Sequence, residues 1–125
     1  MARSISPDVH RFVTERIHSV AQLELLLILH RDPTVEWTAE AAAREMRYPT
    51  DWAAEELLAF RRAGLVGVRG PAYRFRARSA LAHIVDELAE TFSRRRSTVT
   101  ALIFSGTGKD VQCFSDAFRV PRKEG

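Results

Sequence analysis

The chain has 125 residues, of which 46% are hydrophobic and 28% charged, and this composition is typical of one soluble folded domain. The apolar run at residues 25–29 is bounded by Glu24 and His30, far short of the roughly 18 to 20 residues that a membrane span needs. Residues 1–7 show no basic segment followed by an apolar stretch, and the single Cys113 has no internal disulfide partner. We therefore predict a cytoplasmic protein without a membrane segment.

The net charge of +3 hides two regions of opposite sign. Residues 36–57 contain six acidic residues and two arginines, whereas residues 61–96 contain nine arginines and three acidic residues. Only Lys109 and Lys123 are lysines, and together with the many alanines this bias is typical of a GC-rich bacterial genome. Arginine is therefore weaker evidence of function here than in an average sequence.

The N-terminal part of the chain predicts two helices. Ser6 is a suitable N-cap and Pro7 suits the first helical position, so we expect a helix over residues 7–17. Ser19 and Gln22 have the spacing of a capping box, which would open the second helix. That helix carries apolar residues on many faces and should lie at the centre of the core.

Residues 38–76 begin with a pattern that predicts two short helices. Thr38 is the expected N-cap of the first. The run at residues 49–51, Pro-Thr-Asp, should end that helix and cap the second one, which we expect over residues 51–63. Gly64 stands where a left-handed C-terminal cap belongs.

A hairpin is predicted directly after the second of these helices. Its strands are residues 65–69 and 72–76, joined by a Gly-Pro turn. Alternation in the second strand separates two aromatic residues from Arg74 and Arg76, so the hairpin should have a basic outer side. The short run at residues 35–37 is a candidate third strand.

This order of helix, turn, helix and hairpin resembles the winged helix-turn-helix superfamily, and the Ala63-Gly64-Leu65-Val66 junction resembles that of bacterial regulators of the MarR and PadR kind. The resemblance covers residues 19–78. It implies a mainly α fold with a small β-hairpin, in which a winged helix-turn-helix core carries extra N- and C-terminal helices. The expected organisation is an N-terminal helix (1–18), the core (19–78), C-terminal helices (79–118) and a basic tail (119–125).

The C-terminal segment predicts a helix with a packing seam. Ser79 is the expected N-cap, and Leu81, Val85, Leu88 and Phe92 have the 4-3-4 spacing of such a seam. Homodimerisation through this helix is the leading hypothesis, because a long helix in this place commonly pairs with its counterpart in dimeric winged-helix regulators; intrachain packing is the alternative. Residues 80–103 are compatible with one long helix or two helices separated at the arginines 94–96, and residues 97–105 also with a strand. A short helix over residues 110–118 follows.

No motif predicts catalysis or a bound metal. The Gly106-Thr107-Gly108-Lys109 run lacks the glycine spacing of a phosphate-binding loop, and the histidines and Cys113 are scattered. We therefore expect neither an enzyme nor a cofactor.

The winged-helix resemblance implies a transcription regulator that binds double-stranded DNA, with the second helix of the motif in the major groove and the wing on the backbone. Acidic residues at the expected groove positions disfavour base contacts, so the basic wing should carry most of the binding. The predicted nucleic-acid contacts are Arg47, Thr50, Arg69, Arg74, Arg76 and Arg78. As an alternative, arginines on an edge hairpin keep it soluble and unpaired.

A second hypothesis makes the chain a protein-interaction module. A tryptophan in the first turn of an otherwise acidic helix is typical of a binding hot spot with a charged rim. The predicted partner contacts are Tyr48, Asp51, Trp52 and Glu55. The alternative is that the Trp52 ring folds back onto the core.

Overall fold

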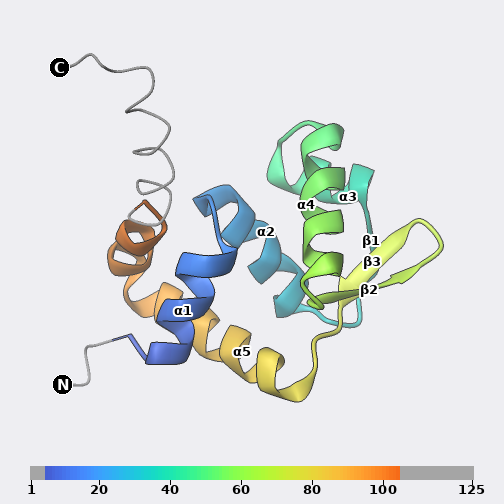
Figure 1. Cartoon of the computed structure of the whole chain (residues 1–125). Helices are drawn as coiled ribbons and strands as arrows, with labels where there is room; N and C mark the ends of the chain where they lie inside the picture. The colour runs from blue at the N-terminus through green and yellow to red at the C-terminus, as the bar shows by residue number, and fades with distance from the viewer. Residues whose placement is uncertain (1–4, 105–125) are drawn as a thin grey trace, which may run out of the picture.

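The computed structural model describes residues 5–104, which form a mainly helical fold with a small three-stranded antiparallel sheet (Figure 1). The helices are α1 (Pro7–Arg16), α2 (Val20–Arg31), α3 (Ala39–Met46), α4 (Thr50–Arg62) and α5 (Ser79–Arg94), followed by a helical segment at residues 96–104; the strands are β1 (Trp37–Thr38), β2 (Val66–Arg69) and β3 (Ala72–Phe75). To this extent the predicted fold class is confirmed. Within the described residues, none of the helices combines the length and the apolar character that crossing a membrane requires.

The three expected N-caps in the first part of the chain are confirmed. The hydroxyl oxygens of Ser6, Ser19 and Thr38 accept backbone N–H bonds at 3.2, 3.0 and 3.1 Å from the residues three positions later. Each bond satisfies a donor that the first helical turn leaves free, and its loss typically costs about 1 kcal/mol. The capping box is only half formed, because the side-chain oxygen of Gln22 accepts from the backbone N–H of His18 at 2.6 Å rather than from Ser19.

Two other helices begin without the side-chain cap that the sequence predicts: the α4 cap falls within the predicted run at residues 49–51 but makes no side-chain bond, and the α5 cap is not Ser79. The N-cap of α4 is Pro49 and that of α5 is Arg78, and neither makes a side-chain cap bond. For Thr50 or Ser79 to be the N-cap, each helix would have to begin one residue later than it does. The first helical hydrogen bonds are already accepted by the carbonyl of Pro49, from Ala53 at 3.1 Å, and by that of Arg78, from Ala82 at 2.7 Å. Thr50 and Ser79 therefore stand inside the first turn.

Two left-handed residues set the directions of the chain around α4. Arg47 ends α3 with φ of 62°, and Gly64 follows α4 with φ of 79°, a conformation that glycine adopts without steric cost. After Gly64, the N–H of Leu65 donates to the carbonyl of Phe60 at 2.9 Å, which closes the end of α4. The predicted glycine cap is thus confirmed, and it directs the chain into β2.

The sheet has the strand order β1-β3-β2, so the hairpin strand β3 is central. The predicted third strand at residues 35–37 begins later than expected. The N–H of Val35 donates to the carbonyl of Asp32 at 3.1 Å, so Val35 belongs to a turn and pairing with β3 starts at Trp37.

The core is continuous from α1 through α2 to α4, the sheet and α5. In Figure 1, α1 and α5 lie on one side of α2, whereas α3, α4 and the sheet lie on the other. Fully buried aliphatic side chains at its centre are Leu23, Leu25, Leu26, Leu29, Leu57 and Leu88. The prediction that α2 lies at the centre is confirmed.

The seam of α5 packs inside the chain. Val85, Leu88 and Phe92 are buried, and α5 contacts both α1 and α2. These side chains therefore pack within the chain, which is the alternative to a dimer seam. The helix breaks at Arg95, and residues 96–104 form a separate helix, which decides against a strand there. Cys113, the predicted helix over residues 110–118 and the basic tail lie outside the described residues.

Candidate functional site

The β2–β3 hairpin has one apolar and one basic face. Val66 pairs with Phe75, and both are buried toward the core. On the opposite face, Gly67 pairs with Arg74 and Arg69 pairs with Ala72. Because side chains alternate between the two faces of a strand, this register sends Arg69 and Arg74 to the outer face together.

Three arginines surround one hollow on this outer face. The N–H of Arg76 donates to the carbonyl of Leu65 at 2.9 Å, which continues the strand pairing past β3 and keeps Arg76 on the same face as Arg74. The hollow has a volume of about 240 Å³ and is lined by Glu36, Gly67, Val68, Arg69, Ala72, Arg74 and Arg76. We call Arg69, Arg74 and Arg76 the outer-face arginine cluster. Guanidinium groups gathered in this way favour a phosphate or carboxylate ligand.

A carboxylate shares this hollow. An Oε2 atom of Glu36 lies 3.5 Å from Nη1 of Arg69, and the two side chains are 36% and 84% exposed. An ion pair this long and this exposed contributes little to stability. The carboxylate of Glu36 lowers the charge of the hollow by one, but the three arginines keep that charge positive.

The other predicted nucleic-acid contacts lie elsewhere. Arg78 is the N-cap of α5 and does not line the hollow. Arg47, the C-cap of α3, and Thr50, the first residue of α4, are exposed at the end of α4 away from β2 (Figure 1). The structure thus brings together three of the six predicted residues.

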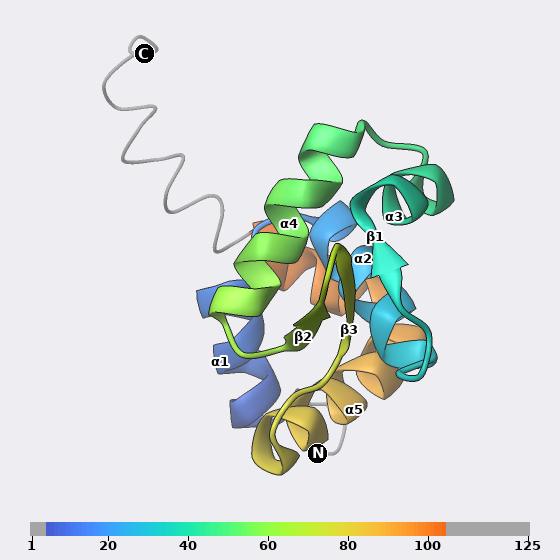
Figure 2. The same ribbon diagram turned by 90° about the vertical axis from the view of Figure 1, so that its right-hand side faces the viewer.

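Helix α4 and the hairpin lie side by side on one face of the molecule (Figure 2). The exposed residues of α4 are Thr50, Asp51, Ala54, Glu55, Leu58, Arg61 and Arg62. This outward face is acidic in its first half and basic in its last turn, which leads into the hairpin. Leu58, Arg61 and Arg62 are not among the site residues that the sequence predicts, although helical spacing from Asp51 places them on this face.

The four predicted partner contacts gather at the beginning of α4. The rings of Tyr48 and Trp52 are 4.4 Å apart with an interplanar angle of 34°. Trp52 is half-buried and packs against the core, whereas Tyr48 is 43% exposed. Asp51 and Glu55 are exposed beside them. Trp52 therefore belongs partly to the core, and Tyr48 is the more accessible aromatic residue of the pair.

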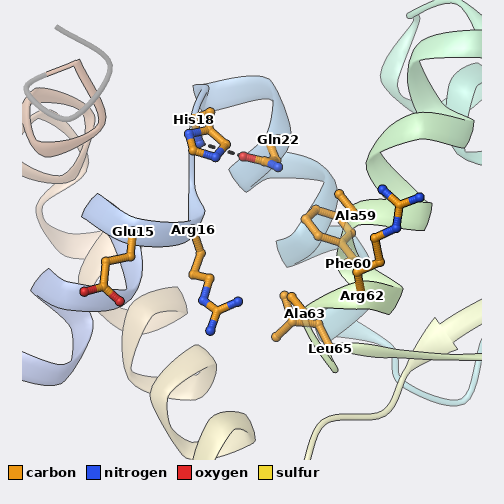
Figure 3. Close-up of a pocket in the computed structure, with 9 residues that line it drawn as sticks. All are labelled: Glu15, Arg16, His18, Gln22, Ala59, Phe60, Arg62, Ala63 and Leu65. Carbon is orange, nitrogen blue, oxygen red and sulfur yellow. Dashed lines mark hydrogen bonds between the residues drawn. The ribbon is translucent and has the colours of Figure 1, made fainter. Parts of the chain in front are cut away.

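A second hollow of about 310 Å³ separates the α1–α2 junction from the end of α4 (Figure 3). Gln22 and His18 lie at one end of this hollow, and Arg16 extends from α1 toward Ala63 and Leu65 at the other. The remaining lining residues are Glu15, Ala59, Phe60 and Arg62. Gln22 is a buried polar residue, 5% exposed. Its side chain forms a hydrogen bond with Glu56 and so links the beginning of α2 to α4.

Burial raises the pKa of Glu56 above its ordinary value, and the neighbouring charge of Glu55 raises it further. The hydrogen bond from Gln22 and the charge of His18 act in the opposite direction and are weaker than burial. A raised carboxyl pKa in the fold means that Glu56 stabilises the protein at acidic pH, and that this contribution is lost as the pH rises through the folded-state pKa.

Glu56→Gln should therefore raise the melting temperature at pH 7, because the amide keeps a hydrogen-bond acceptor for Gln22 without burying a charge. The gain should shrink as the pH falls toward 4, because the wild-type carboxyl takes up a proton in the fold and then buries no charge. Thermal melts of both chains at the two pH values measure this difference. An equal gain at both pH values would contradict the assignment.

Within residues 5–104, no three His, Cys, Asp or Glu side chains are grouped so that they could hold a metal ion. The candidate binding features among the described residues are therefore the outer-face arginine cluster, the outward face of α4 and the aromatic pair at the beginning of α4. Comparison of the sequence and structure with models of known protein families, with curated proteins and with solved structures gives no match.

Proposed function

We propose that the chain is a winged-helix DNA-binding protein, of the transcription-regulator type, that holds duplex DNA mainly through phosphate contacts. The outer-face arginine cluster carries this proposal, because three cationic side chains on one face of a projecting hairpin suit a row of phosphates. The element order from α2 through β1, α3, α4 and the hairpin supports it, since this is the order of a winged helix-turn-helix domain.

The charges of α4 suggest how the domain would bind. Arg61 and Arg62 lie in the last turn of α4, which leads into the hairpin, and add positive potential at that end, whereas Asp51 and Glu55 oppose approach to phosphates. We therefore propose that phosphate contacts at the hairpin side of α4 supply most of the affinity, with little base recognition by the first turn of α4.

Nuclear magnetic resonance of the ¹⁵N-labelled chain tests this proposal. A titration with a random-sequence duplex at low salt should shift the backbone signals of residues 66–76 and the arginine side-chain signals of the hairpin, and it should leave α1 unchanged. Shifts centred on α1 and α5, or no shifts at all, would contradict the proposed interface.

A second candidate is docking of a basic protein segment on the acidic beginning of α4. The exposed Tyr48 ring stacked on Trp52, with Asp51 and Glu55 at its rim, favours it. Tyr48→Ala should abolish capture of such a partner and change the melting temperature by only a few degrees, because Tyr48 is 43% exposed and lies outside the buried core. Val35→Ala removes another exposed apolar side chain and serves as the control. A partner retained by Tyr48→Ala would exclude this surface.

A further inference from the structure

We propose that two residues set the affinity of the outer-face arginine cluster for DNA phosphate: Gly67 positions Arg76, and Glu36 competes with phosphate for Arg69. This inference rests on the proposed function, because it takes the anion to be a phosphate of duplex DNA. It adds two residues that carry no positive charge and that charge patterning alone does not reveal.

Gly67 supplies space rather than backbone freedom. The glycines with positive φ among the described residues are Gly64 and Gly70, so the conformation at Gly67 is one that other residues adopt. A glycine inside a strand is otherwise unfavourable, since it has no side chain to pack. A reason for it lies across the strand: a Cβ atom at position 67 would stand 3.2 Å from Cδ and 3.5 Å from Cβ of Arg76.

The stem of Arg76 therefore lies against the backbone of Gly67. Strand alternation puts Arg76 on the outer face with Arg74, which pairs with Gly67, and the missing side chain at position 67 leaves room for the Arg76 stem there. A Cβ at position 67 would make the Arg76 stem give way by a few tenths of an ångström, and we expect a branched side chain to shift the stem further and move its cation away from the cluster. Gly67 is thus a positioning residue.

Glu36 acts in the opposite direction. It lines the same hollow, and its carboxylate is paired with Arg69, so a phosphate that binds Arg69 would have to replace it. The separation of 3.5 Å and the exposure of both side chains make this pair weak, so a phosphate can displace it. The remaining negative charge still repels phosphate and lowers the affinity.

Gly67→Val tests the positioning role, because valine favours a strand while crowding Arg76. The affinity for a fluorescent random-sequence duplex is measured at low salt for Gly67→Val, Arg76→Ala and the double variant. We expect each single change to weaken binding about threefold and the double variant to be no weaker than Arg76→Ala alone. Wild-type affinity for a folded Gly67→Val chain, or effects that multiply in the double variant, would overturn this role.

Glu36→Gln tests the competing role. It should strengthen DNA binding about two- to fivefold, and Glu90→Gln is its matched control. Glu90 also forms an exposed ion pair with an arginine, Arg94, at 3.0 Å, but it lies on α5 away from the hairpin. Equal effects of the two substitutions would show that only net charge matters and would overturn the inference.

The failure of this inference is distinguishable from the failure of the proposed function. If removal of Arg74 and Arg76 leaves DNA binding unchanged, the proposed interface is wrong and this inference falls with it. If that removal weakens binding while Gly67→Val behaves as wild type and Glu36→Gln as its control, the interface stands and only the inference is wrong.

Discussion

Replacing both Arg74 and Arg76 with alanine should weaken binding to duplex DNA roughly tenfold at low salt, whatever the DNA sequence. The two side chains line the same hollow on the outer face of the hairpin, and each is expected to displace the counterion of one phosphate. The slope of log affinity against log salt should therefore become shallower by about 1.8, since each phosphate contact contributes about 0.9.

A second double variant separates this local effect from the change in net charge. Arg11→Ala with Arg94→Ala removes two exposed arginines from α1 and from the end of α5, on the side of the molecule away from the hairpin (Figure 1). Its salt slope should remain within experimental error of wild type. Equal losses in the two double variants would show that binding depends on overall charge rather than on the hairpin.

Leu88→Ala should lower the free energy of unfolding by about 2 to 5 kcal/mol, because it leaves a cavity in a side-chain position that is fully buried. For a domain of this size the corresponding fall in melting temperature is about 10 °C or more. Leu58→Ala makes the same chemical change on the exposed face of α4, where the leucine is 36% exposed, and should cost much less.

The dependence on protein concentration distinguishes intrachain packing from a dimer seam. Leu88 packs between α5 and its neighbours α1 and α2 in the same chain. The destabilisation should therefore be the same at low and high protein concentration. A melting temperature of the wild-type chain that rises with concentration, and a loss of that rise in Leu88→Ala, would instead favour an interchain role for this residue.

Several predictions that depend only on neighbouring residues are confirmed. Ser6, Ser19 and Thr38 cap helices because each hydroxyl reaches an N–H three residues away, and Gly64 takes a left-handed conformation that its sequence position favours. The starts of α4 and α5 were misplaced by one residue, because there the first backbone bond forms without a capping side chain and no local signal marks it.

The features that depend on distant residues were not predictable in the same way. The spacing of the α5 seam fits a second chain as well as α1 and α2, so only the packing in space decides between them. Glu36 reaches the outer-face arginine cluster because Trp37 pairs with Tyr73 far along the chain. The sequence indicates that both segments are extended, but their register is a tertiary property.

The affinity of the wild-type protein for random-sequence duplex DNA, measured across a range of salt, tests directly whether the chain binds DNA phosphates. With three phosphate contacts from the outer-face arginine cluster, log affinity should fall against log salt with a slope of about −2.7 or steeper. No binding at the lowest salt, or a slope near zero, would contradict this account.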